Sequence, residues 1–285
     1  MAYTRLVSFL NQFLLNPVGA KLVSLTADRA ESAKLQELVK KDQFNGAVYP
    51  VPESFKSCDP TPILSALESS RLNRARIFDT ATAPDGFHAD NMYFTTPDVD
   101  VLYAIISYLK PKRFIEVGSG NSTLIARRAV SDNGLDTKII SIDPNPRKDV
   151  SVAVDIQHLS RLETVDLSLF DQMQAGDVLF IDSSHELQIG NDVAVLYLQV
   201  IPKLPVGVII HIHDIFLPYE YPQEWIVNQR WKWNEQQLVQ AMLYFSDKFE
   251  VLWPGHYLQN TRTDFPKHFP NIGSNTAQSL WLRIN

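Results

Sequence analysis

Two short segments of the chain end in polar side chains that could carry out acid–base or metal chemistry. Segment 180–186 reads FIDSSHE and segment 211–216 reads HIHDIF, so in each an aspartate and a histidine close an apolar run. A positioned histidine can remove the proton of a hydroxyl group, and carboxylates with imidazole can instead hold a divalent cation. The candidate residues are Asp182, His185, His213 and Asp214.

The residues alone leave both roles open. His185, His213 and Asp214 are the candidates for catalysis, and Asp182, His213 and Asp214 are the candidate ligands for Mg²⁺. A structural role, with aspartates capping turns and histidines satisfying buried hydrogen bonds, explains any one of these residues better than all four together. His211 lies deeper on the same strand as His213, and we expect a core histidine there.

A glycine turn precedes this region, in the segment 114–128, FIEVGSGNSTLIARR. Gly118 and Gly120 allow the backbone to turn tightly and to approach a ligand closely. The following Asn-Ser-Thr is typical of a helix start, where free N–H groups face outward. Asp143 closes the next apolar run, and a carboxylate there can accept hydrogen bonds from ribose hydroxyls. Together these features predict a nucleoside-binding site.

NAD is the first nucleotide to weigh against this turn. The dinucleotide fingerprint requires a third glycine, and Thr123 stands at that position. Glu116, two residues before the first glycine, would repel a pyrophosphate but attract a sulfonium and an amino group. The glutamate therefore favours S-adenosylmethionine over NAD.

Short apolar runs alternate with helical patterns from about residue 96 onward. Such runs are typical of a parallel sheet covered by helices on both faces. The last two runs lack an intervening helix, which favours antiparallel pairing. The predicted fold is α/β: a Rossmann-like, doubly wound, seven-stranded, mostly parallel sheet with an antiparallel last strand. The expected strands are 113–118, 138–143, 155–159, 177–182, 207–214, 249–255 and 278–284.

Five ordered segments resemble class I S-adenosylmethionine-dependent methyltransferases, most of all a bacterial branch with an FIDSSH…HIHDIF signature. They read EVGSGNST, SIDPNPR, GDVLFIDSSHE, IHDIFLPYEYPQEW and WNEQQLVQAML, and the resemblance covers roughly residues 90–285. It implies that the cofactor is bound by Glu116, Gly118, Gly120, Ser122, Asp143, Val165, Asp166 and Asp182. Ser122 stands where the family usually has a third glycine. Related enzymes with acidic pairs at these strand ends use magnesium, so the resemblance also implies Mg²⁺ as a second cofactor.

The first 95 residues read as helices joined by a proline-rich connection at 48–62. Residues 6, 9, 10, 13 and 14 are apolar and lie on one face of an N-terminal helix. We expect a helical extension over 1–95, which covers the site or forms a homodimer, followed by the methyltransferase domain over 96–285.

Composition limits the class of partner and compartment. The net charge is -6, which disfavours nucleic acid. No run is apolar enough to span a membrane, and the single cysteine, Cys58, is typical of a reducing, cytoplasmic protein. We expect O-methylation of a small hydroxylated metabolite or sugar. The alternatives are an NAD-dependent oxidoreductase, a hydroxylase or hydrolase that uses the same metal, and a non-catalytic cofactor-binding protein.

Overall fold

The computed structural model describes residues 1–285 except 1, 21, 23–24, 79–85 and 90. The chain divides into two compact units. The smaller unit consists of residues 1–46 and 222–231, and the larger unit of residues 47–221 and 232–285. Among the described residues, no helix has the length and apolar character that crossing a membrane requires.

The larger unit is built on one seven-stranded sheet with the order β3-β2-β1-β4-β5-β7-β6. The first five strands are parallel, and β7 lies antiparallel between β5 and β6. This confirms the predicted fold class. The strands are β1 (Arg113–Val117), β2 (Lys138–Ile142), β3 (Ile156–His158), β4 (Val178–Ile181), β5 (Ile209–Ile212), β6 (Phe249–Pro254) and β7 (Leu280–Ile284).

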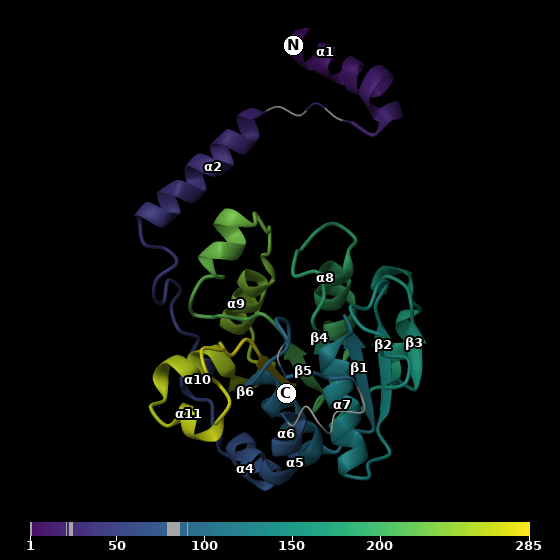
Figure 1. Ribbon diagram of the computed structural model, residues 1–285, viewed down its shortest axis with the longest axis vertical. Coiled ribbons are helices and arrows are strands. Elements are labelled where there is room, and N and C mark those ends of the chain that lie inside the picture. Colours follow the sequence, from purple (N-terminus) through teal and green to yellow (C-terminus); the bar gives the residue numbers. More distant parts are fainter. Residues whose placement is uncertain (1, 21, 23–24, 79–85, 90) are drawn as a thin grey trace. The chain divides into compact units, whose positions relative to one another are not determined.

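Helices cover both faces of this sheet. In Figure 1, α4 to α7 gather toward the bottom of the view, and α8 and α9 lie above them, near the middle. The helices of the larger unit are α3 (Glu53–Lys56), α4 (Thr61–Ser69), α5 (Arg71–Ala75), α6 (Asp98–Leu109), α7 (Asn121–Asp132), α8 (Asp192–Val195), α9 (Glu235–Phe245), α10 (Gly255–Thr261) and α11 (Phe265–His268). The turns of α8 continue as a π-helix (Leu196–Val200) and a 3-10 helix (Ile201–Lys203).

Strand side chains alternate between two hydrophobic cores. On β1, Phe114 packs with α4, α6 and α7, whereas Ile115 packs with α8 and α9. On β4, Phe180 and Leu179 divide in the same way. Because both faces are buried, the strands read as continuous apolar runs, and their carboxyl ends meet at one edge of the sheet.

The division between the units falls at residue 46, not at the expected boundary near residue 95. Helix α4 explains the difference, because its Ile63 and Leu67 are buried in the same core as Phe114. The smaller unit contains α1 (Ala2–Leu10), a π-helix (Asn11–Leu15), α2 (Leu25–Lys40) and a π-helix at Glu224–Asn228. Its role in covering the site or forming a dimer stays a prediction.

The segment between β6 and β7 differs from the long loop expected there. It contains α10 and α11, with Phe265 and Phe269 buried against Trp253 of β6. Proline at the second position of α11 fits a helix start. The prolines and asparagines of this segment therefore mark helix ends and not an unstructured connection.

Candidate functional site

The glycine turn joins the carboxyl ends of three neighbouring strands. The N–H of Gly118 donates to the carbonyl of Ile142 at the end of β2 (3.0 Å), and the N–H of Asp182 donates to Val117 at the end of β1 (2.9 Å). Gly118 has φ +84°, and a Cβ there would lie 1.7 Å from the carbonyl oxygen of Asp182. Only glycine fits this crossing of β1 and β4. Space in front of Gly120, by contrast, is open.

Glu116 faces the start of α7. Its carboxylate accepts hydrogen bonds from the hydroxyls of Ser122 (2.5 Å) and Thr123, and the N–H of Gly120 donates to the Thr123 hydroxyl (3.0 Å). Glu116 is fully buried and does not line the cleft described below. Burial raises the pKa of this carboxyl to about 8, although the two hydroxyls oppose the shift. The structure therefore places Glu116 and Ser122 beneath the turn as its support, so the expected attraction of a sulfonium by Glu116 lacks direct contact.

A cleft of about 370 Å³ opens above the glycine turn. Gly118, Asp143 and Asp182 line it together, at the ends of β1, β2 and β4. One oxygen of Asp143 accepts from the N–H of Ser119 (2.8 Å) and the other from the N–H of Asn145 (2.7 Å). Oδ1 has a second lone pair available, whereas Oδ2 also accepts a long hydrogen bond from the Ser119 hydroxyl (3.4 Å). The geometry suits a ribose whose hydroxyls meet Asp143.

The far wall of the cleft is formed by Leu162 and Glu163. Val165 and Asp166, expected near the adenine, line a separate hollow on the other side of this turn. The Asp166 carboxylate accepts from the N–H of Ser168 (3.0 Å) and so caps a 3-10 helix, Leu167–Gln172. Val165 and Asp166 therefore do not line the cleft above the glycine turn, and their role beside the adenine stays a prediction.

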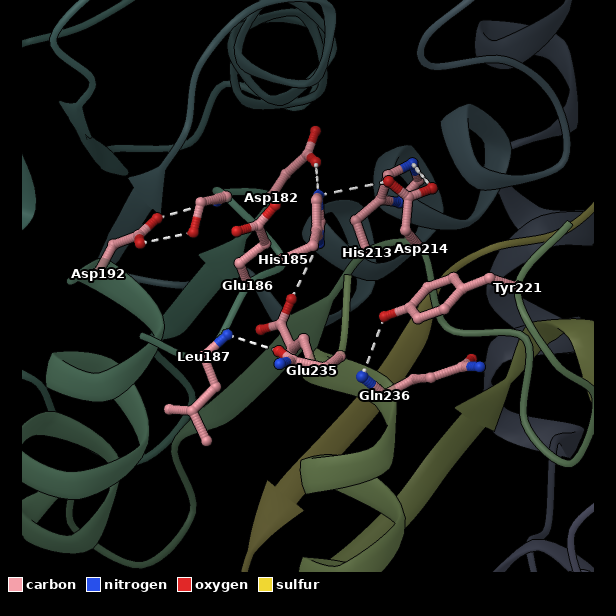
Figure 2. A network of polar contacts seen from close by, with 12 residues as sticks. Asp182, His185, Glu186, Leu187, Asp192, His213, Asp214, Tyr221, Glu235 and Gln236 are labelled. Carbon is pink, nitrogen blue, oxygen red and sulfur yellow. Dashed lines mark hydrogen bonds and ion pairs between the residues drawn. The ribbon is translucent and has the colours of Figure 1, made fainter. Parts of the chain in front are cut away.

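A second cluster lies beside the cleft, where β4 and β5 end (Figure 2). Nε2 of His185 lies 3.3 Å from Oδ1 of Asp182 and 3.3 Å from Oδ2 of Asp214. On the other side of the ring, Nδ1 lies 2.9 Å from Oε2 of Glu235, whose Oε1 accepts from the Tyr197 hydroxyl (2.8 Å). Burial lowers the pKa of His185, but the three carboxylates outweigh it and hold the pKa well above the usual range.

Unusual backbone conformations bring this cluster together. His185 (φ +58°) and Asp214 (φ +56°) both adopt the left-handed region, which is costly for residues other than glycine. The His185 carbonyl accepts the N–H groups of Asn234 (3.0 Å) and Glu235 (3.1 Å) at the start of α9. Asn234 holds the N-cap position of α9, but its side-chain oxygen accepts from the N–H of Leu187 (2.5 Å) and does not cap the helix.

His213 points elsewhere than expected. Its ring packs 5.2 Å from that of Phe94 and 5.5 Å from that of His211, and Nε2 lies 3.9 Å from Oδ1 of Asp214. Residues two apart on a strand share a face, so His213 follows His211 toward the core on the α6 side. His211 itself is a core histidine, as expected. It is stacked on Phe180 at 3.7 Å and bonded to the Ser279 hydroxyl (2.9 Å).

The aromatic residues that follow β5 divide between the two units. Trp225 and Trp231 pack against each other in the smaller unit, with ring centroids 5.1 Å apart and planes tilted by 40°. In the larger unit, Trp233 packs on the ring of His185 at 4.3 Å and Tyr221 is buried. Trp233 therefore covers His185.

The chemistry of the cluster fits a divalent cation. One ligand atom from each of Asp182, His185 and Asp214 lies within 4.8 Å of the others. Metal binding would displace the Nε2 proton; the neutral His185 would then donate Nδ1–H to Glu235 and present its Nε2 lone pair to the space between the two aspartates. Carboxylates behind metal-binding histidines commonly act in this way. His185 thus takes the place that the expected ligand set gave to His213.

Several functional residues carried no signal in the sequence. In the sequence, Glu235 looks like an acidic residue at the start of a helix, and Tyr197 looks like an aromatic residue on a helix face. Only the fold places them behind His185. Arg147 closes the segment SIDPNPR and also lines the cleft. The position of Glu235, directly after the N-cap of α9, is a weak signal by itself, because acidic residues are favoured there in any helix.

Comparison with known proteins agrees with this geometry. Residues 115–215 match the family model described as a methyltransferase domain. No curated protein matches the chain. Among solved structures, the S-adenosylhomocysteine-bound methyltransferase PaMTH1 of Podospora anserina is 17% identical, with 93% of this chain and 97% of that chain covered and a TM-score of 0.44. An O-methyltransferase of Bacillus cereus is 13% identical, with 77% and 90% covered and a TM-score of 0.41.

The matched segment begins in β1 and ends after β5, so it contains the glycine turn, Asp143 and, of the polar cluster, Asp182, His185 and Asp214 but not Glu235. Residues 115–215 are thus similar in sequence to methyltransferase domains. The family match and the sheet order support this class over the NAD-dependent oxidoreductase.

Proposed function

We propose that the protein transfers the methyl group of S-adenosylmethionine to a hydroxyl oxygen of a small acceptor. The observation that carries this proposal is that Asp182 belongs to both sites. It lines the cleft, and its carboxylate contacts His185 in the polar cluster. A methyl donor in the cleft would therefore lie next to groups that can bind and deprotonate an alcohol.

The cluster supplies the proton chemistry that O-methylation needs. In-line transfer requires an oxygen nucleophile held behind the methyl group, and orientation alone can contribute about 7–11 kcal/mol. Burial raises the pKa of Asp214, which makes its carboxylate a stronger base. The side chain of Asp214 is 10% exposed, enough to meet an acceptor, while His185 is held behind it.

Asp182, His185 and Asp214 are the residues that would hold a divalent cation here. When bound, such an ion lowers the pKa of a coordinated hydroxyl. An imidazole ligand suits Mn²⁺, Co²⁺ or Zn²⁺ better than Mg²⁺, which prefers oxygen ligands. This departs from the magnesium expected by resemblance. Titration calorimetry of the metal-free protein with MnCl₂ and MgCl₂ tests the preference, and His185→Ala should abolish the stronger binding.

Thermal unfolding with ligands tests the proposed function first. S-adenosylmethionine and S-adenosylhomocysteine at a hundredfold their Kd should each add about 2.7 kcal/mol of stability. For a unit of this size that raises Tm by roughly 5–11 °C, at about 2–4 °C per kcal/mol. A panel of sugars, alcohols and phenols, scored by release of S-adenosylhomocysteine, then identifies the acceptor. Stabilisation by NAD alone, or methyl transfer confined to nitrogen acceptors, would contradict the proposal.

A further inference from the structure

Arg147 has an unusual position among the charged groups of the cofactor cleft. Four acidic side chains line this cleft: Asp143, Glu163, Asp182 and Asp192. Of the described lining residues, only Arg147 and Arg161 carry a permanent positive charge. Most of the cleft therefore attracts the sulfonium and amino groups of S-adenosylmethionine. Only these two arginines could attract the α-carboxylate of the same molecule.

Arg161 already has a partner. Its Nε lies 3.4 Å from Oε1 of Glu163, and its side chain is 69% exposed. It also belongs to the wall formed by Leu162 and Glu163, beyond the end of β2 and away from the glycine turn. The charge of Arg161 is thus balanced before any ligand binds.

Arg147, by contrast, has no carboxylate within 4.0 Å among the described residues. Its guanidinium carbon lies 4.6 Å from the centre of the Tyr93 ring. An arginine stacked on an aromatic face keeps the N–H groups at its edge available for hydrogen bonds. Such a guanidinium is preorganised for bidentate contact with a carboxylate.

The segment that carries Tyr93 is fixed to both sides of the cleft. The side chain of Asn91 accepts from the N–H groups of Tyr93 (3.0 Å) and Phe94 (2.8 Å), and it also accepts from Asn121 at the start of α7 (3.0 Å). Lys148 donates to the carbonyl of Gly86 on the opposite side (3.1 Å). Tyr93 is therefore held near the start of α7, which follows the glycine turn, and its ring contacts the guanidinium of Arg147.

We propose that Arg147, oriented by Tyr93, binds the α-carboxylate of the methionine part of S-adenosylmethionine and positions the methyl donor against Asp182. Asp143 then meets the ribose, and the acidic side chains meet the positive groups. The inference rests on the proposed use of S-adenosylmethionine. It adds that Arg147 makes the protein prefer this cofactor to the same molecule without the α-carboxylate.

Calorimetry with two ligands isolates the carboxylate contact. S-adenosylmethionine and decarboxylated S-adenosylmethionine differ only in that group. The wild-type protein should bind the first about 10- to 100-fold more tightly, as expected for a hydrogen bond between charged groups. In Arg147→Ala this ratio should fall to about 1 through loss of affinity for S-adenosylmethionine alone. Arg147→Lys, which keeps the charge without the planar fork, should retain an intermediate ratio.

Arg161→Ala is the matched control, because it removes the other arginine of the cleft and should leave the ratio unchanged. Tyr93→Leu should lower the ratio several-fold by releasing the guanidinium. Equal thermal midpoints of the ligand-free variants show that the fold is intact. An unchanged ratio in Arg147→Ala overturns the inference while leaving the cofactor assignment in place. Failure of the wild-type protein to bind either ligand overturns both.

Discussion

Nδ1 of His185 lies 2.9 Å from Oε2 of Glu235, and both side chains are buried. One residue follows β4 and the other begins α9, so this contact joins two segments fifty residues apart. Glu235 holds a proton on Nδ1, and it aims the opposite nitrogen at Asp182 and Asp214.

Glu235→Gln should therefore lower turnover about 10- to 100-fold, the usual cost of losing a carboxylate behind a functional histidine. The affinity for S-adenosylhomocysteine should be unchanged, since Glu235 does not line the cleft. Steady-state kinetics and calorimetry on the same preparation provide the two readouts. Tyr197→Phe removes one hydrogen bond to Glu235 and should have the smaller effect. Full activity of Glu235→Gln would exclude this positioning role.

Asp214→Asn and His185→Ala should reduce turnover by at least about 100-fold with the cofactor still bound. Neither residue lines the cleft, and in the proposed reaction both act on the acceptor. Single-turnover assays with bound S-adenosylmethionine measure the chemical step directly. If either variant retains the wild-type rate, its residue does not carry the proton chemistry.

Asp143→Ala should weaken the binding of S-adenosylhomocysteine about 10- to 100-fold, because it removes charged acceptors for the ribose hydroxyls. It also frees the N–H groups of Ser119 and Asn145. Asp143→Asn keeps one oxygen acceptor and should retain more affinity. Calorimetric titration measures both variants, and wild-type affinity in Asp143→Ala would remove this residue from the ribose site.

The two glycines of the turn should respond differently to alanine. Gly118→Ala places a methyl group 1.7 Å from the Asp182 carbonyl oxygen and at φ +84°, so it should destabilise the protein by at least about 2 kcal/mol. Gly120→Ala meets open space at an extended φ of 170°, and its effect on the ligand-free protein should stay within about 0.5 kcal/mol. Urea unfolding of both variants compares them; equal destabilisation would contradict the described crossing of β1 and β4.

Glu116 should make stability depend on pH. Its pKa is about 8 in the folded protein against an ordinary value of 4.5, so the unfolded chain loses the proton first as pH rises. Ionisation therefore destabilises the folded state between about pH 4.5 and 8. Glu116→Gln removes this loss. Relative to wild type, the variant should gain up to about 1.4 kcal/mol per pH unit across that window. Unfolding free energies at pH 5 and 8 test this, and a pH-independent difference would contradict it.

The sequence was sufficient for the sheet because its strands are buried on both faces and read as apolar runs. It also placed Asp143, Gly118 and Asp182 at strand ends, where parallel strands converge. It misjudged His213, because the direction of a side chain just beyond a strand depends on local backbone angles. The positive φ values of His185 and Asp214 leave no clear mark in the sequence. The contact of Glu235 with His185 could not be predicted, because it depends on where α9 begins in space.

The contacts of His185 with α9 limit how far the chain can be shortened. The segment that matches the methyltransferase family ends at residue 215, yet the ring and the carbonyl of His185 are both held by residues 234 and 235. A fragment trimmed to the matched segment would keep the glycine turn, Asp182, His185 and Asp214, but it would lose the contacts that hold His185 in place. The residues that line the cleft and the residues that position His185 thus lie in different parts of the chain, and exchanging residues 216–285 would change the second set without the first.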